Sequence, residues 1–328
     1  MAEVICFGEI LLRLSPPQSA RFGQAKSFDF CFGGAEVNTA VGLCGLGTSA
    51  GIVSLLPDNP LGRTALGELR RHGVDCSGLG LRDGRMGLYF LEKGASQRPS
   101  SVLYDRAGSV FSLAKDIDFD FKTLLSGAKH LHLTGITPAL GAALPGLCLN
   151  AVRVAKELGV SVSFDPNYRA KLWGVEEAAS VIKGLMPYVD LCISNLGQAA
   201  DIFGIHTHDA ELAARSISEA YGCKTVAITQ RTALSASINR WSAGLWSAGS
   251  YYSSREYEMQ IVDRVGGGDA FAAGLIYAHL KAKPPQEQIE LAAAAGCLKH
   301  SIQGDFPLFS LQELEALAGG DTAALVRR

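Results

Sequence analysis

Three consecutive glycines and an aspartate open an alanine-rich stretch of helical character near the end of the sequence, Gly266-Gly267-Gly268-Asp269. Without side chains, the glycines can turn their backbone N–H groups toward an anion, and a helix N-terminus adds partial positive charge there. A carboxylate beside such a site can accept a hydroxyl proton while the oxygen attacks phosphorus. The alternative is that Asp269 only caps the helix. No Lys-Ser or Lys-Thr follows the glycines, so the run is not a Walker A loop.

Two further runs could hold a small ligand. The pair Gly33-Gly34 leads into a helical stretch, where backbone can approach a ligand closely, and Asn38 lies one turn further on. Taken alone, this run can also be a plain strand-to-helix turn. Asp165, Asn167 and Arg169 follow a predicted strand, and ligands of open α/β sheets bind beyond the carboxyl ends of strands. The forked guanidinium of arginine suits a phosphate or a carboxylate.

A third group lies on a predicted β-hairpin made by residues 87–93 and 100–106, with Gly94 in its connection. Alternate residues share one face of a strand, so Tyr104 and Arg106 are expected on the same side. Together with Tyr89 they could close over an anionic sugar. The alternative for Arg106 is a solvated surface charge.

Short apolar runs alternate with helical stretches along the chain, which predicts βαβ units and a parallel sheet covered on both faces. The predicted strands are Val4–Phe7, Ala50–Leu56, His130–Leu133, Val160–Phe164, Leu191–Ser194 and Thr225–Thr229. The predicted helices are Leu61–His72, Leu140–Leu158, Glu176–Met186, Asp209–Tyr221, Phe271–Lys281, Gln286–His300 and Leu311–Ala318. Residues 10–32 and 86–104 have strand character without long helices and predict a small antiparallel sheet. Of the alternating His130 and His132, one is expected in the core and one outside it, without chemistry.

Composition narrows the class of protein. Of 328 residues, 48% are hydrophobic and 19% charged, which indicates a globular fold rather than disorder or a coiled coil. With 30 basic and 32 acidic side chains the net charge is −2, and nothing favours nucleic acid or an anionic membrane as a partner. The eight cysteines form no C-x-x-C pair, and reduced thiols are expected. The N-terminal residues lack the layout of a secretory signal, so we expect a cytoplasmic protein.

Three motifs in this order, GGAEVNTA, FDPNYRAKLW and DRVGGGDAFAAG, resemble those of the ribokinase-like (PfkB) carbohydrate kinases. The resemblance extends over nearly the whole chain. Within that family, GLYFLEKG, SVLYDRAGS and the NYR-x-x-LW run look most like the kinases of 2-keto-3-deoxygluconate. Fructokinases carry a similar N-x-R-x-x-LW run. The resemblance implies one three-layer α/β/α domain over residues 1–328, with a mainly parallel central sheet and a β-sheet lid drawn from about 10–32 and 86–107.

The resemblance also implies transfer of the ATP γ-phosphoryl group to a sugar hydroxyl, with ATP and Mg²⁺ required. Asp269 would be the base, and Gly266, Gly267 and Gly268 the anion hole. The residues expected to hold the sugar acid, with Asp269, are Gly33, Gly34, Asn38, Tyr89, Tyr104, Arg106, Arg169 and Asp305. Those expected to face the nucleotide, besides Gly266 and Gly268, are Asn167, Asn195, Thr229 and Arg231. A homodimer through the lid is also implied, and a monovalent cation near the last motif stays open.

The sequence departs from the family pattern in two places. The family commonly has N-x-x-E with a glutamate that helps to organise Mg²⁺, whereas Gln198 follows Asn195 here. Glutamine can orient a water but cannot offset the charge of the metal, so the residues that hold the metal stay unassigned. The T-x-G-x-x-G nucleotide turn is replaced by Thr229-Gln230-Arg231 and the residues after it.

Three alternatives to this substrate and activity stay open. One is a fructokinase or another sugar kinase of the family. A second is a non-catalytic protein that binds sugar or nucleotide, and its only support is Gln198 and the altered turn at Thr229. A third, an NAD-dependent oxidoreductase, is disfavoured because no glycine fingerprint follows the first strand.

Overall fold

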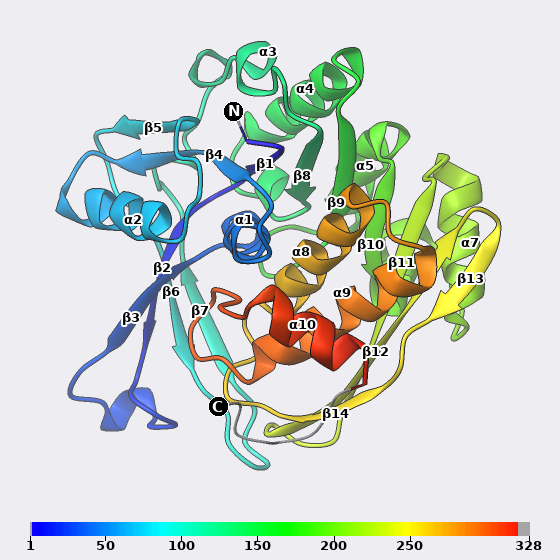
Figure 1. The fold of residues 1–328 in the computed structure, drawn as a ribbon. Helices are drawn as coiled ribbons and strands as arrows, with labels where there is room; N and C mark the ends of the chain where they lie inside the picture. Colours follow the sequence, from blue (N-terminus) through cyan, green and yellow to red (C-terminus); the bar gives the residue numbers. More distant parts are fainter. Residues whose placement is uncertain (1, 321–328) are drawn as a thin grey trace.

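A large mixed sheet forms the middle layer of the molecule, and the computed structural model describes residues 2–320 (Figure 1). Its parallel strands follow the order β5 (Leu79–Arg82), β4 (Ala50–Pro57), β1 (Val4–Phe7), β8 (His130–Thr134), β9 (Ser161–Asp165), β10 (Leu191–Asn195) and β11 (Thr225–Ala233). An antiparallel extension continues it with β12 (Ile238–Ser247), β13 (Ser250–Ser253) and β14 (Tyr257–Gln260). The central strands β4, β1, β8 and β10 are buried along nearly their whole length because helices cover both faces.

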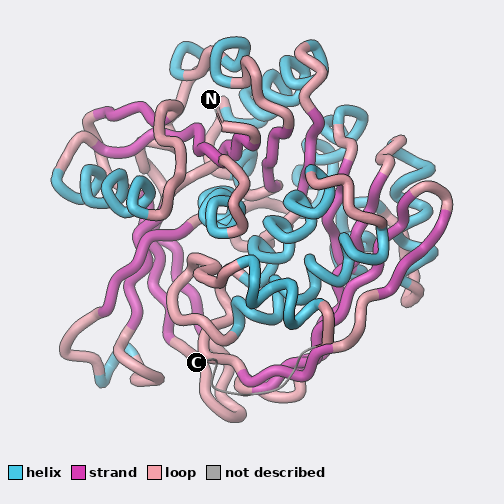
Figure 2. Tube along the Cα trace, viewed as in Figure 1, coloured by secondary structure: helices cyan, strands magenta, loops and turns pink. Residues whose placement is uncertain are grey.

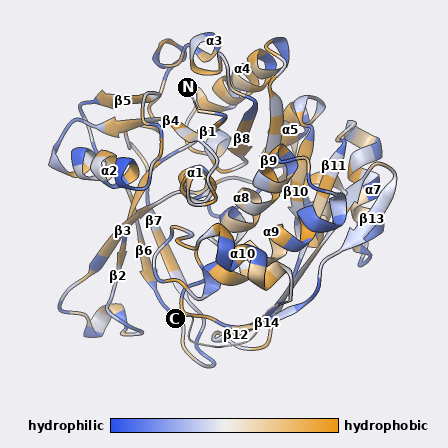
Figure 3. Ribbon diagram, in the orientation of Figure 1, coloured by the Kyte–Doolittle hydropathy of each residue, from blue (hydrophilic) through white to orange (hydrophobic). Residues whose placement is uncertain are grey.

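The helices divide between the two faces (Figure 2). On one face lie α1 (Ala35–Gly45), α2 (Pro60–Arg71), α8 (Gly267–Leu280), α9 (Pro285–His300) and α10 (Leu311–Ala318). On the other lie α3 (Phe121–Leu124), α4 (Leu144–Glu157), α5 (Val175–Leu185), α6 (Leu196–Phe203) and α7 (Ala210–Tyr221). Alternate residues of one strand enter different cores, as Cys6 and Phe7 of β1 do. Hydrophobic residues follow the strands, whereas the outer helix α2 carries hydrophilic ones (Figure 3).

A second, four-stranded sheet projects from the body in the order β3-β2-β6-β7 (Figure 1). Its strands are β2 (Leu11–Ser15), β3 (Asp29–Gly33), β6 (Gly87–Glu92) and β7 (Ser101–Asp105). Strands β6 and β7 form the predicted antiparallel hairpin, with Gly94 in its connection. The inner face of this sheet carries its own small apolar cluster around Leu11, Tyr89 and Leu91. The sheet therefore stands over one end of the body as a lid.

The predicted fold class, a three-layer sandwich with a mainly parallel sheet and a small lid, is confirmed. Two local predictions were wrong. His130 and His132 are both buried and both hydrogen-bond the Ser163 hydroxyl at 2.8 Å, because a strand in the middle of a covered parallel sheet has no solvent side. Helix α8 begins at Gly267 instead of Phe271, with Gly266 as its cap, so Gly267 and Gly268 lie in its first turn.

Among residues 2–320, no helix is long and apolar enough to cross a membrane. The eight cysteines are free thiols, each of them at least partly buried.

Candidate active site

A cavity of about 880 Å³ opens at the carboxyl ends of the parallel strands, between the body and the small sheet. Every residue that the sequence analysis assigned to a site lines it, with the exception of Gly33. Gly33 packs against the Asp305 carboxylate, which a Cβ at this position would overlap. The structure thus brings residues from the beginning, middle and end of the chain to one place.

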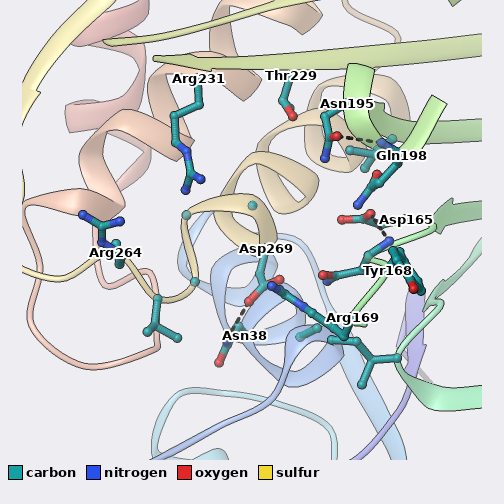
Figure 4. A pocket seen from close by; sticks show the side chains of 18 of the residues that line it. Asn38, Asp165, Tyr168, Arg169, Asn195, Gln198, Thr229, Arg231, Arg264 and Asp269 are labelled. Atoms are coloured by element: carbon teal, nitrogen blue, oxygen red, sulfur yellow. Dashed lines mark hydrogen bonds between the residues drawn. The ribbon is translucent and has the colours of Figure 1, made fainter. Parts of the chain in front are cut away.

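Asp269 lies at the floor of this cavity, in the first turn of α8 (Figure 4). Its carboxylate accepts a hydrogen bond of 2.7 Å from the Asn38 side-chain amide, which comes from the packed helix α1. Burial raises the pKa of Asp269 to about 7, although the Asn38 bond opposes this shift. The cap of α8 is Gly266, so the alternative that Asp269 caps the helix is wrong. A carboxylate held in this way is suited to accept a proton near neutral pH.

The backbone ahead of Asp269 forms an anion-binding turn. Gly266 adopts the left-handed conformation at φ 86°, where a side chain would also overlap the Asp305 carbonyl. The N–H groups of Gly267, Gly268 and Asp269 fall in the first helical turn, which has no intrahelical acceptors for them. A Cβ at Gly268 would meet nothing within 4 Å, so this side of the turn is open to the cavity. The turn therefore presents N–H donors and a helix N-terminus to a ligand.

A tight turn after β9 aims Arg169 into the cavity. Asn167, at φ 36°, donates its backbone N–H to the Asp165 carboxylate at 2.8 Å, which fixes the turn. The Arg169 side chain extends toward Asp269 (Figure 4). Burial raises the pKa of Asp269, and the positive charge of Arg169 partly opposes this increase. The neighbouring Trp173 is buried in the core. Arg169 is thus a positive group beside the candidate base.

The lid contributes two tyrosines and an arginine to the cavity. The Tyr89 hydroxyl donates to Asp305 at 2.5 Å, and Tyr89 and Tyr104 face each other across β6 and β7. The Arg106 guanidinium lies 5.7 Å from the centre of the Tyr104 ring. Arg106 is 8% exposed and donates from Nε to Glu9 at 2.7 Å. The alternative that Arg106 is a solvated surface charge is therefore wrong, and its positive charge is partly offset by Glu9.

Sequence reasoning missed a buried ionic network that joins lid and body. Arg13 of β2 pairs with Asp305 at 2.7 Å and with Asp263 at 2.6 Å, and these side chains are almost fully buried. Lys93, after β6, lies 3.4 Å from the same Asp263 carboxylate. The two acids flank the Gly266 turn in space, so the network couples the lid to the anion-binding turn. An arginine in the apolar run LLRLS was the only signal of it in the sequence.

The opposite end of the cavity is formed by the ends of β10 and β11 and by the chain after β14. The Asn195 side chain accepts the backbone N–H of Gln198 at 2.9 Å and so caps α6, while the Thr229 hydroxyl donates to the Ser194 carbonyl at 3.2 Å. Arg231 and Arg264 lie on this side of the cavity (Figure 4). Burial and the charge of Arg231 both lower the pKa of Arg264.

Two cations brought together in this way favour an anionic ligand. Arg264 was not singled out from the sequence, although it stands in the DRVGGGD run.

A carboxylate also lies near Gln198. Asp165 ends β9 and faces Gln198 across the cavity floor (Figure 4). Burial raises the pKa of Asp165 to about 6. Among the described residues no three His, Cys, Asp or Glu side chains converge as a metal cage. A cation here would depend on one carboxylate, waters and the ligand's own oxygens, which is how Mg²⁺ is commonly held beside phosphates.

Comparison with known proteins adds a family to this geometry. Residues 1–305 match the pfkB family of carbohydrate kinases. A relative from Haloferax volcanii, named 2-dehydro-3-deoxygalactonokinase, is 33% identical over 98% of both chains. A crystal structure of 2-dehydro-3-deoxygluconokinase from Thermotoga maritima superposes with a TM-score of 0.94 at 48% identity, covering 97% of this chain and 98% of that one.

A putative ribokinase II from E. coli, in complex with ATP and Mg²⁺, has the same fold. Its TM-score is 0.83 at 21% identity, over 97% of this chain and 99% of that one.

Proposed function

The chain belongs to the pfkB family of carbohydrate kinases, and from this premise we propose that it transfers the γ-phosphoryl group of ATP to a hydroxyl of 2-keto-3-deoxygluconate (2-dehydro-3-deoxygluconate). The observation that carries the proposal is the placement of Asp269 between the glycine turn and Arg169 in one cavity. The glycine turn suits a transferring phosphoryl group, and Arg169 suits the carboxylate of a sugar acid. The likeness to kinases named for keto-deoxy sugar acids supports the same substrate class.

In this mechanism Asp269 takes the proton of the sugar hydroxyl as its oxygen attacks the γ-phosphorus, and the bond from that phosphorus to the β-phosphate oxygen breaks to release ADP. Asn38 holds one carboxylate oxygen of Asp269, leaving the other for the hydroxyl. The N–H groups of Gly267 and Gly268 face the charge that develops on the phosphoryl oxygens. Phosphoryl transfer depends mainly on positioning and charge stabilisation, and these groups supply both.

The sugar end of the cavity is proposed to hold the substrate through Gly34, Asn38, Tyr104 and Arg169. Arg169 has a side chain that reaches into the cavity, and we assign it the substrate carboxylate. Arg106 contributes to the same end, but its bond to Glu9 makes it the weaker carboxylate partner. Tyr89 and Asp305 are committed to each other, so their part is to shape the pocket and hold the lid.

The nucleotide is proposed to lie at the other end, against Asn195, Thr229, Arg231 and Arg264. The positive charge of the two arginines supports a triphosphate there. Asn167 and Asp165 lie between the two ends, where Asp165, with Gln198 orienting waters, would hold Mg²⁺. Such an ion would neutralise charge on the β- and γ-phosphates.

We also propose that the protein is a single kinase domain that forms a homodimer through the lid. The lid carries large apolar side chains that remain exposed, with Phe28 at 42%, Phe30 at 59% and Leu103 at 57%. Apolar clusters of this kind mark interaction surfaces. Sedimentation of the purified protein tests this, since a Phe30→Ser/Leu103→Ser variant should sediment as a monomer if the lid forms the interface. The free thiols support a cytoplasmic location.

The test of the function is ADP release with ATP and Mg²⁺ over 2-keto-3-deoxygluconate, its galacto epimer, fructose, ribose and adenosine. Turnover selective for the keto-deoxy acids is expected. The epimer is included because the relative from Haloferax volcanii is named for it. Turnover on fructose alone would make the chain a fructokinase and remove the carboxylate assignment. Thermal stabilisation by a sugar without any ADP release would make it a binder.

A matched variant pair makes this test specific to the carboxylate. Arg169→Met should raise the KM for the keto-deoxy acid by about 10²-fold, as expected for losing a charged contact worth ~2–3 kcal/mol. Arg153→Met, on the outer face of α4, removes an exposed arginine and should leave KM unchanged. An equal KM for Arg169→Met and the unaltered protein would refute the assignment of Arg169.

A further inference from the structure

Lys299 is a lysine whose side chain is completely buried, one residue before the end of α9. Lysine is almost never fully buried unless its ammonium finds compensation. Here Nζ donates to the Ile302 carbonyl at 3.0 Å, and among the described residues it makes no ion pair within 4 Å. Burial lowers the pKa of Lys299, while the nearby Asp263 and Asp305 carboxylates oppose that shift. The mechanism above leaves this charge unused.

The position of Lys299 relates it to the anion-binding turn. A Cβ placed on Gly266 would lie 3.1 Å from Lys299 Cε, so the lysine stem packs against the back of the turn whose front faces the cavity. Helices α8 and α9 pack closely along each other (Figure 1), and this packing fixes the separation. The ammonium is therefore held behind Gly266 by the body of the fold rather than by a flexible loop.

Behind the turn, Lys299 makes a third cation against two acids, and Asp269 on the cavity side also interacts with its charge. The two acids, Asp263 and Asp305, are already matched by Arg13 and Lys93. Lys299 adds a further positive charge in a region of low dielectric, where its field extends further than it would in water. Lys299 lies against Gly266, whereas the side of the turn at Gly268 is open, so this field adds to that of the helix N-terminus at the cavity.

The carboxylates of Asp263 and Asp305 offer few free oxygens to a separately bound cation. The Asp263 carboxylate accepts from Arg13, from the Gly304 N–H and from the Val265 N–H. The Asp305 carboxylate accepts from Arg13 and Tyr89. Their oxygens are thus occupied by donors of the chain itself, which disfavours their use as ligands of a bound ion.

We propose that the ammonium of Lys299 is a built-in cation that supports the Gly266–Gly268 anion site from behind and makes a bound monovalent ion unnecessary. Lys299 touches no substrate, so it is a positioning residue. The inference rests on the proposed kinase function, because the anion it favours is the phosphoryl group in transfer.

The experiment removes the charge in two ways. Lys299→Met keeps most of the volume without the charge, and its kcat is expected to fall by about 10²-fold with little change in the sugar KM, as for loss of one preorganised electrostatic group. Lys299→Ala opens a space behind Gly266, and its kcat should recover at least about 10-fold with saturating NH₄⁺, K⁺ or methylammonium, but not with tetramethylammonium. The unaltered protein should turn over equally in K⁺ and tetramethylammonium. Lys283→Met removes a partly exposed lysine and should behave as the unaltered protein.

The melting temperature provides a second measurement that does not depend on catalysis. The melting temperature of Lys299→Ala should rise with NH₄⁺ relative to tetramethylammonium, and that of the unaltered protein should not. Three results would overturn the inference: a K⁺ requirement in the unaltered protein, an undiminished kcat in folded Lys299→Met, or no response of Lys299→Ala to any small cation. If Lys299→Ala does not fold, Lys299→Met decides. If the unaltered protein phosphorylates no sugar, the proposed function fails, while the melting experiment still decides the role of Lys299.

Discussion

Replacement of Arg13 by methionine removes the charge that joins the lid to the body. The Arg13 guanidinium is 3% exposed and bonds two carboxylates that are 1–2% exposed. Breaking a buried ion pair by removing one partner costs about 3–5 kcal/mol, because the other charge stays buried without compensation. With an unfolding entropy near 2 cal/mol/K per residue, a loss of about 4 kcal/mol lowers the Tm of a chain of this length by roughly 6 °C.

The pH dependence of this loss has a defined sign. Burial raises the pKa of Asp305. Burial acts in the same direction on Asp263, but the charge of Arg13 outweighs it, so the pKa of Asp263 is lowered. Without Arg13 both carboxyls should titrate above their unfolded values. Protonation then relieves the buried charge, so the variant should lose less stability at pH 5 than at pH 8.

The assay is thermal unfolding of Arg13→Met beside Arg63→Met at both pH values. Arg63 pairs with Asp58 on the surface, where its side chain is 66% exposed, and its removal should cost less than about 1 kcal/mol. A Tm for Arg13→Met within about 1 °C of the unaltered protein, or a larger loss at pH 5 than at pH 8, would refute the reasoning.

Three further predictions concern the cavity. Because burial raises the pKa of Asp269 to about 7 and the base must be ionised to accept a proton, kcat/KM should rise with pH through about 7 and stay flat above it; a profile flat from pH 5 to 8 would contradict this. Gly266→Ala should lower kcat by about 10²–10³-fold, measured as ADP release, because a methyl group at φ 86° would displace the turn from the Asp305 carbonyl. Gln198→Glu should lower the Mg²⁺ concentration needed for half-maximal rate several-fold, since it adds a carboxylate beside Asp165; an unchanged requirement would remove this place as the metal site.

Much of the fold follows from local patterns. Most of the parallel strands were predicted from short apolar runs between helical stretches, and their ends carry polar residues that line the cavity. The edge formed by β12, β13 and β14 was not predicted, because residues 238–260 mix serine, tryptophan and charge without a clear alternation. These strands take their form from pairing with β11 and with each other. Their stability comes from tertiary context rather than local propensity.

The candidate site was predictable where short motifs carry it and not where distant charges meet. Asp269 and Arg169 stand in runs whose residue types already indicate their chemistry. By contrast, Arg13 and Asp305 are 292 positions apart, and no local pattern pairs them. Arg106 was expected on the ligand-facing side of the hairpin, and its bond to Glu9, 97 positions away, could not be predicted from the sequence. In the sequence, Lys299 lies near the end of a predicted helix, where a lysine is usually exposed. In the structure, packing against Gly266 buries it.

The central claim is that Asp269 is the base of a phosphoryl transfer to a sugar acid. The most direct test compares the unaltered protein with Asp269→Asn, which keeps the volume and an acceptor for the Asn38 amide. ADP release with 2-keto-3-deoxygluconate and ATP should fall by about 10²–10⁴-fold, while calorimetry finds the sugar bound with nearly the same affinity. Turnover of Asp269→Asn at the rate of the unaltered protein would contradict the account.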